Sequence, residues 1–210
     1  MSRGRSVLDK WRKTGAAVSG ILLAGALAAL CIAGRITREV VSESGIAYEQ
    51  KVDSVAYGYQ LEQDFVPQYG YLDSVAVHVD ASGCARELGE LQVSILDKYG
   101  DQVFFAAVPV PDLPQYGWVE VPVHMQLAPG EVKTLVLESV GCVDSGPKIS
   151  FIDTRLAAAA EQQGFDLVYA GVPKEHLGLK MMFIYAVPIE VYEYFIYYVF
   201  GLILILIALV

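Results

Sequence analysis

The three histidines of this chain are its first candidates for acid–base chemistry. His78 stands between two valines in a strand-like run, His124 closes another such run, and His176 lies in a loop. None has a serine or cysteine beside it in a nucleophile-like context, and the sequence contains no nucleophile elbow, phosphate-binding glycine loop or His-Glu-x-x-His pattern. We expect ordinary strand or surface histidines, and the sequence favours a protein that is not an enzyme, with no catalytic residue and no cofactor.

Two pairs of carboxylates have spacings that chemistry can use. Glu62 with Asp64, and Asp97 with Asp101, could hold a cation in a loop or act as the two acids of a glycosidase. Solvated acids at turns explain the same spacing more simply. We therefore expect no metal site at either pair.

Cysteine usage fits an oxidising compartment. Cys31 lies inside an apolar segment, whereas Cys84 and Cys142 each follow a predicted strand in a glycine-bearing loop. These two permit one disulfide, which would close a loop of about 58 residues and contribute roughly 4 kcal/mol in the chain-entropy model. Two free thiols are the alternative. Zinc binding is not expected, because no histidine or further cysteine lies at ligand spacing.

Aromatic residues are the better functional candidates. Residues 67–71 and 114–118 are both Pro-Gln-Tyr-Gly-aromatic segments, each at the entry to a predicted strand. Exposed rings can stack on sugar faces or anchor a protein partner. The predicted ligand-binding residues are Tyr69, Tyr71, Tyr116 and Trp118. We expect Trp118 to belong to the core, with Tyr69 and Tyr116 as the exposed rings.

The elements that position these residues are strands. Apolar and polar residues alternate with a period of two through the middle of the chain, and glycine- and proline-containing turns separate the runs. The predicted strands are Leu72–Asp80, Leu91–Asp97, Val103–Val108, Gly117–Val123, Thr134–Ser139, Lys148–Ile152, Phe165–Tyr169 and Leu179–Val187. Eight short strands at this spacing predict an antiparallel β-sandwich.

Two stretches depart from this pattern. Residues 35–54 are charged and amphipathic with Ile36, Val40 and Val41 at helical spacing, so they are predicted to form a stalk. Residues 154–164 are alanine-rich and predict a short helix that Asp153 or Thr154 caps and Gly164 ends.

The order of these segments resembles the jelly-roll sandwiches of carbohydrate-binding modules. The residues that carry the resemblance are Gln63 and Phe65, Leu72, Val75 and Val77, Gly89, Leu91, Val93, Ile95, Asp97 and Gly100, Trp118, Val119 and Val121, and Leu127 and Gly130. Similar domains are displayed between the first two spans of bacterial polytopic envelope proteins, including membrane glycosyltransferases. Over residues 60–187 the resemblance implies a jelly-roll-like β-sandwich and a glycan ligand.

Apolar segments lie at both ends of the chain. Gly15–Gly34 has twenty residues without a charge, enough to span a hydrocarbon core of roughly 30 Å. Five basic residues and one acid precede it, so we predict a signal anchor with a cytoplasmic N-terminus. A cleaved signal peptide is the alternative. Tyrosines lead into the second segment, Phe195–Val210, as at a membrane interface.

One stripe of the first segment has small residues four apart: Ala16, Gly20, Ala24 and Ala28. Small residues at this spacing let helix backbones approach closely in lipid. We predict that this stripe packs on another transmembrane helix, for which the second segment is a candidate. The frequent occurrence of alanine and glycine in signal anchors is the alternative explanation.

The charge distribution divides the chain. Residues 1–14 carry a net charge of +4, whereas residues 35–193 carry ten basic and twenty-three acidic groups, a net charge of -13. Nucleic-acid binding needs a clustered basic patch, so we exclude it for the acidic region. The predicted organisation is a basic cytoplasmic tail (1–14), a first span (15–34), a stalk (35–54), an extracytoplasmic sandwich (55–188) and a second span (189–210).

These features predict a non-catalytic accessory module of the cell membrane. Its expected partners are membrane lipid, cell-envelope glycan and a larger integral membrane protein. The second interpretation is that the chain is the N-terminal portion of a longer polytopic transferase or transporter whose active part lies beyond Val210.

Overall fold

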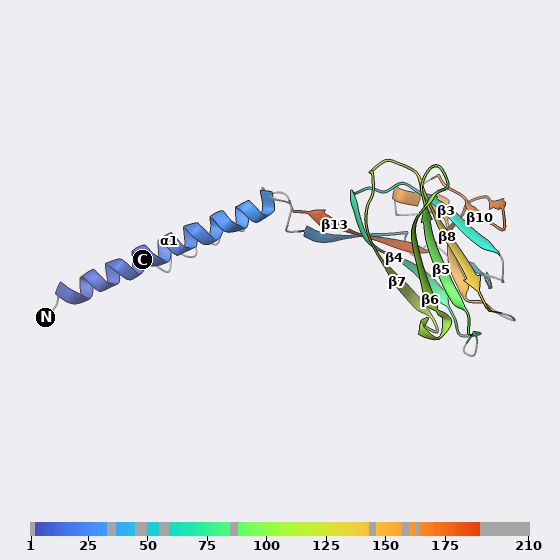
Figure 1. The fold of residues 1–210 in the computed structure, drawn as a ribbon, viewed down its shortest axis with the longest axis horizontal. Helices are drawn as coiled ribbons and strands as arrows, with labels where there is room; N and C mark the ends of the chain where they lie inside the picture. The colour runs from blue at the N-terminus through green and yellow to red at the C-terminus, as the bar shows by residue number, and fades with distance from the viewer. Residues whose placement is uncertain are drawn as a thin grey trace. The chain divides into compact units, whose positions relative to one another are not determined.

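The computed structural model describes residues 3–32, 37–44, 50–54, 59–84, 88–142, 146–156, 160–162 and 164–189. The chain divides into two compact units: Met1–Arg38 with Val187–Val210, and Glu39–Ala186. In the first unit, Arg3–Ile32 forms helix α1 (Figure 1). Within the described residues, no helix combines the length and the apolar character that crossing a membrane requires. The predicted second span, residues 189–210, lies outside the described residues apart from Ile189.

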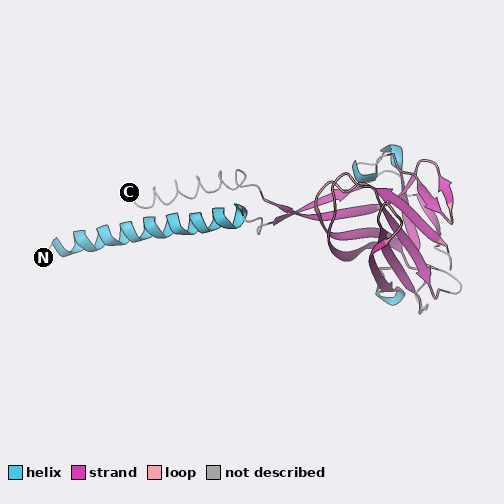
Figure 2. Cartoon of the chain, turned by 45° about the horizontal axis from the view of Figure 1, so that its top comes forward, coloured by secondary structure: helices cyan, strands magenta, loops and turns pink. Residues whose placement is uncertain are grey.

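The second unit is mainly β and contains two antiparallel sheets, whose strands are magenta in Figure 2. The seven-stranded sheet has the order β1-β13-β4-β9-β12, with β2 paired to β9 and β7 paired to β4. Its strands are β1 (Thr37–Glu43), β2 (Gln50–Ser54), β4 (Tyr71–Asp80), β7 (Gly117–Gln126), β9 (Lys148–Asp153), β12 (Leu177–Leu179) and β13 (Met181–Pro188).

The six-stranded sheet has the order β11-β10-β3-β8-β5-β6. Its strands are β3 (Gln60–Phe65), β5 (Glu90–Leu96), β6 (Gln102–Pro109), β8 (Lys133–Val140), β10 (Leu167–Tyr169) and β11 (Val172–Lys174). The predicted sandwich and its eight strands are confirmed, with ends that differ by a few residues.

The core lies between the sheets, where alternate residues of each strand meet. Leu91, Val93 and Ile95 of β5 are buried, as their period of two predicts. The ring of Phe65 in the six-stranded sheet stacks on that of Phe183 in the seven-stranded sheet, with centroids 4.8 Å apart. This contact ties the two sheets together.

The prediction of a helical stalk over residues 35–54 was wrong for the part that the structure describes, residues 37–44 and 50–54. Thr37–Glu43 and Gln50–Ser54 are strands of the seven-stranded sheet. Val40 and Val41 fit helical spacing, but β-branched side chains are stiff in a helix and pack well in a strand. In the sheet, β1 pairs with β13 and β2 pairs with β9.

The predicted alanine-rich helix is also corrected. Its described parts are two 3-10 helices, Thr154–Leu156 and Ala160–Gln162, which we label η2 and η3. Asp153 does accept the backbone N–H of Arg155 at 3.0 Å, as the capping prediction expected. The backbone oxygen of Glu161 accepts a hydrogen bond from Val66 N at 2.9 Å, which ties η3 to the end of β3 rather than to a continuing helix.

A junction in the seven-stranded sheet positions the candidate site. Here β12 pairs with β9 and β13 pairs with β4, and Lys180 is the residue between β12 and β13. Lys180 N donates to Ser150 O at 2.8 Å, and Lys180 O accepts from His78 N at 3.0 Å. The backbone thus holds Lys180, Ser150 and His78 next to one another.

Candidate functional site

An aromatic group occupies the outer face of the seven-stranded sheet beside this junction. Val77 and Val79 of β4 are buried in the core, so the alternation of a strand places His78 on the opposite face. Trp118 of β7 is opposite His78 in register. The imidazole meets the rings of Tyr116 and Trp118 edge-on, with centroid distances of 4.7 Å and 5.1 Å.

We call the set Tyr116, Trp118, His78, Ser150 and Lys180 the Trp118 face. Its outer members are accessible: Tyr116 is 52% exposed, and Trp118 and Lys180 are half-buried. Its inner members are buried, and His78 Nδ1 lies 2.8 Å from Ser150 Oγ. A buried polar pair therefore fixes the imidazole that supports both outer rings.

Local chain geometry brings the two rings together. Gly117, between them, has a φ of 150°, which residues with a side chain rarely adopt. Just before it, Gln115 O accepts a hydrogen bond from Ala81 N at 3.1 Å, which fixes the Pro-Gln-Tyr-Gly turn to the end of β4. This turn starts β7 with Tyr116 and Trp118 both against His78.

A positive charge lies at the same place. Lys180 Nζ is 5.6 Å from the centroid of the Trp118 ring. This is near the outer limit of about 6 Å for a cation–π contact. The Trp118 face therefore combines two accessible aromatic rings with an ammonium group, which together can bind a ligand that has an apolar face and polar or anionic substituents.

The expectation that Trp118 belongs to the core was wrong. Val119 and Val121 are the buried residues of this part of β7, so Trp118 is on the other side of the strand. The predicted exposure of Tyr116 and Tyr69 is confirmed, because these residues are 52% and 36% exposed.

The structure separates the two predicted aromatic pairs. Tyr71 begins β4 and is opposite Gln126, whereas His78 and Trp118 are opposite each other near the far end of β4. Seven residues of strand separate them, roughly 23 Å at 3.3 Å per residue. Tyr69 packs on buried Tyr185 with centroids 5.2 Å apart. Tyr69 and Tyr71 are therefore not part of the Trp118 face.

The predicted disulfide between Cys84 and Cys142 is not present. The structure holds both as buried thiols, each 2% exposed. Cys84 N donates to Ala81 O in a turn after β4, and Cys142 Sγ packs against Gly89, where an added Cβ would lie 2.5 Å from the sulfur. Both cysteines are therefore small buried side chains of the sandwich.

The acidic pairs serve the fold. Asp97 accepts the N–H groups of Tyr99 and Asp101, and the hydrogen bond from Tyr99 N–H is the main cause that lowers the pKa of this carboxyl. Asp64 lies on β3, and its Oδ1 accepts a hydrogen bond from the hydroxyl of Thr134 at 2.6 Å. Among the described residues, no group of three or more His, Cys, Asp or Glu is arranged to hold a metal ion.

The other histidines lie outside the Trp118 face. His124 is exposed on β7, and its Nδ1 lies 3.0 Å from Asp73 Oδ1. His176 N donates to Asp166 Oδ1 at 2.9 Å in a turn. The prediction of ordinary surface or strand histidines fits these two, whereas His78 has a supporting role that its sequence context did not reveal.

The small-residue stripe lies on α1. Ala16 is exposed, Gly20 and Ala28 are half-buried, and Ala24 is the one residue with a described side chain on this helix that is buried. Packing of the stripe on a second helix stays a prediction.

Sequence reasoning also missed a buried polar cluster beside the core. Glu161 of η3 is buried, and its Oε2 accepts the hydroxyl of Ser42 on β1 at 2.7 Å. Burial, and then the negative charge of Glu161, raise the pKa of Tyr185 on β13. Gln162 Nε2 donates to Leu179 O at 2.9 Å. The cluster connects β1, η3 and β13.

Comparisons with known proteins were made for the whole chain. No protein-family model matches it, and no curated protein matches it. Among solved structures it is similar to one described as the M60 catalytic domain with the CBM51-1 and CBM51-2 domains from Clostridium perfringens ZmpB. The sequences are 13% identical, the TM-score is 0.25, and the match covers 67% of this chain and 18% of that chain. A similarity this low assigns neither a ligand nor an activity to this chain.

Proposed function

We propose that the β-sandwich binds a glycan on the Trp118 face and acts as a non-catalytic binding module. The observation that carries the proposal is the pair of accessible rings, Tyr116 and Trp118, held against buried His78 at 4.7 Å and 5.1 Å. Sugar rings present flat C–H faces that pack on aromatic rings, while their hydroxyls need nearby polar groups. Lys180 and the Tyr116 hydroxyl supply such groups.

Rigidity supports this interpretation. His78 is fixed through its backbone to Lys180 and through its side chain to Ser150, at 3.0 Å and 2.8 Å. Rings that are ordered before the ligand arrives lose little conformational entropy on binding. By contrast Tyr99, on the turn between β5 and β6, is 78% exposed, and its ring contacts the ammonium of Lys98.

Retention on polysaccharides tests the proposal. The full-length protein is run by affinity electrophoresis through gels that contain different soluble polysaccharides. We expect retention in at least one gel, with Trp118→Ala weakening the affinity about tenfold, equivalent to about 1.4 kcal/mol. Tyr116→Ala should also reduce it. Tyr99→Ala is the matched control and should be retained like the wild type. Retention that Trp118→Ala leaves unchanged would refute the assignment of the site.

We further propose that the module is attached to the cell membrane, with the sandwich outside the cytoplasm. The support is in the sequence: Gly15–Gly34 has no charge and follows five basic residues. Extraction of native membranes with alkaline carbonate tests it. The chain should stay with the membrane pellet, and protease added to spheroplasts should cleave the sandwich. Release into the carbonate supernatant would contradict the attachment.

A further inference from the structure

We propose that the glycan bound at the Trp118 face is anionic, with carboxylate or phosphate groups on its sugars. This inference rests on the proposed function, since it names the ligand class of the same site. It comes from the lysines that the fold gathers next to the two rings.

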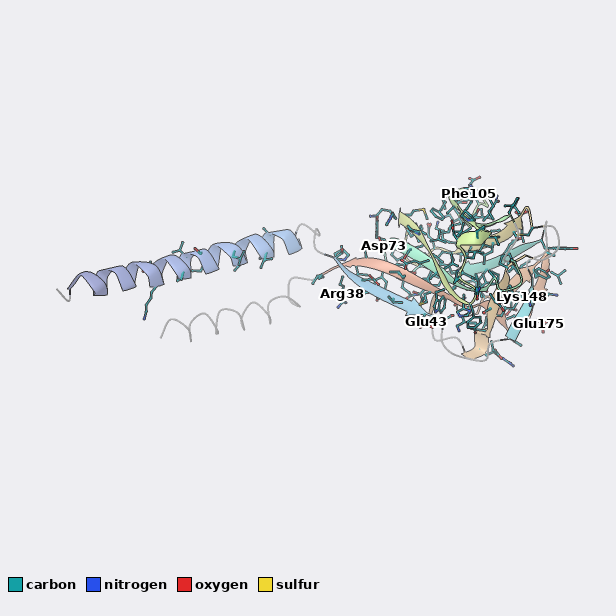
Figure 3. All side chains as sticks on the ribbon, turned by 90° about the horizontal axis from the view of Figure 1, so that it is seen from below. Arg38, Glu43, Asp73, Phe105, Lys148 and Glu175 are labelled. Atoms are coloured by element: carbon teal, nitrogen blue, oxygen red, sulfur yellow. The ribbon has the colours of Figure 1, made fainter. Side chains whose placement is uncertain are left out.

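Two lysines lie on the outer side of the sheet at the junction. Ile149 and Phe151 of β9 are buried in the core, so Lys148 and Ser150 alternate to the outer face, and Lys148 is exposed (Figure 3). Lys180 stands between Leu179 and Met181, which are both buried, and so it too is on the outer face.

A third lysine occupies an adjacent register position. Lys51 of β2 is opposite Ser150 of β9. The backbone of Ser150 thus has Lys51 on one side and Lys180 on the other. Residues 35–193 contain only ten basic groups against twenty-three acidic ones. Of those ten, Lys180 lies beside the Trp118 ring and Lys148 lies on the same outer face of the sheet.

The nearest acids on these strands already have hydrogen-bond donors. Asp80 is opposite Lys148 in register, and its Oδ1 accepts both the N–H and the hydroxyl of Ser82, at 3.0 Å and 2.6 Å. Glu120, two residues after Trp118, accepts the hydroxyl of Ser74 at 2.6 Å. Each of these two carboxylates is therefore held by a hydroxyl donor of the fold.

Geometry links this charge to the rings. Lys180 Nζ lies 5.6 Å from the Trp118 centroid, so a carboxylate or phosphate on a sugar packed against Trp118 comes within reach of the flexible lysine stem. A charge-assisted hydrogen bond is about twice as strong as a neutral one. A neutral sugar would gain the ring contacts and an ordinary hydrogen bond from its hydroxyls.

The test compares each polymer with its own neutral form. The panel contains polygalacturonate, alginate and hyaluronan beside their carboxyl-reduced forms, and a phosphomannan beside its dephosphorylated form. We expect the full-length protein to be retained by at least one charged polymer and at least tenfold more weakly by its neutral partner. Binding of the charged form should weaken as salt rises, because added ions screen the lysines.

Variants separate the ring contribution from the charge contribution. Lys180→Gln should weaken binding of the charged polymer about fivefold and reduce its salt dependence, with a much smaller effect on the neutral form, because the glutamine amide can still donate a hydrogen bond to a hydroxyl. Lys174→Gln, on β11 of the other sheet, is the matched control and should behave like the wild type. Trp118→Ala should weaken both forms.

The possible failures are distinguishable. Equal, Trp118-dependent retention of charged and neutral forms overturns this inference and leaves the proposed function standing. Charged-polymer binding that Lys180→Gln leaves unchanged also overturns it. Absence of retention by every polymer, or retention that Trp118→Ala does not alter, overturns the inference and the proposed function together.

Discussion

Removing the imidazole of His78 is the most informative single change in the binding surface. This side chain is 5% exposed, although it is on the outer side of its strand, because Tyr116 and Trp118 cover it. His78→Ala deletes the support of both rings and the partner of Ser150 Oγ, which lies 2.8 Å from Nδ1. We therefore expect this variant to lose stability and to disorder both rings.

The magnitude follows from the contacts. Each edge-on ring contact contributes about 0.5–1.5 kcal/mol beyond area burial, so the two contribute about 1–3 kcal/mol. The hydrogen bond to Ser150 adds about 1 kcal/mol. His78→Ala should therefore lower the free energy of unfolding by about 2–4 kcal/mol, whereas Ser150→Ala, which removes only the hydrogen bond, should lower it by about 1 kcal/mol.

Urea unfolding of the full-length protein measures both values. A Trp11→Phe background leaves Trp118 as the single tryptophan, so its fluorescence reports the unfolding of the sandwich. His124→Ala is the control: its side chain is 62% exposed beside Asp73, and an exposed pair of this kind contributes at most about 1 kcal/mol. The reasoning is refuted if His78→Ala is no more destabilising than His124→Ala at equal m values.

Three further predictions concern the rest of the sandwich. Gly89→Ala should destabilise the sandwich by about 1–3 kcal/mol in the same urea assay, because an added Cβ would lie 2.5 Å from the backbone oxygen of Val140 and 2.5 Å from the sulfur of Cys142. Gly83→Ala is the control and should be nearly neutral, because no atom lies within 4 Å of the added Cβ. Arg155 lowers the pKa of Asp153 to about 2, chiefly through their side-chain hydrogen bond. Since this pKa is depressed below 3.8, the pair stabilises the fold above pH 3.8 and loses its effect as the pH falls toward 2; NMR titration should show Arg155→Gln raising that pKa, and an unchanged value would contradict the pairing. The two buried cysteines should resist alkylation in the native protein and react after denaturation, as mass spectrometry would record; rapid native labelling would contradict their burial.

Much of the fold was predictable because alternating apolar residues report directly on a half-buried strand. Leu91, Val93 and Ile95 illustrate this, since their period of two matches the face they bury. Strand β3 escaped notice because Gln63 occupies the core-facing position between Leu61 and Phe65. The glutamine is accommodated there by hydrogen bonds to the backbone of Leu179 and Phe165, which no local pattern reveals.

The candidate site was predictable only in part. The Pro-Gln-Tyr-Gly segment identified Tyr116 and Trp118, and the alternation of Val119 and Val121 already placed Trp118 on the outer side of its strand. The size and apolarity of the indole outweighed that signal. The roles of His78 and Lys180 depend on the register of β4 with β7 and on the junction of β12 with β13, which are contacts between segments far apart in the sequence.

The central claim, that a glycan binds on the Trp118 face, is tested most directly by the emission of Trp118 itself. The full-length Trp11→Phe protein is titrated with the polysaccharide that retains it most strongly, while Trp118 fluorescence is recorded. The account predicts a saturable change in emission with a midpoint equal to the dissociation constant from affinity electrophoresis. Binding that saturates while the emission of Trp118 stays constant would place the ligand elsewhere and contradict the account.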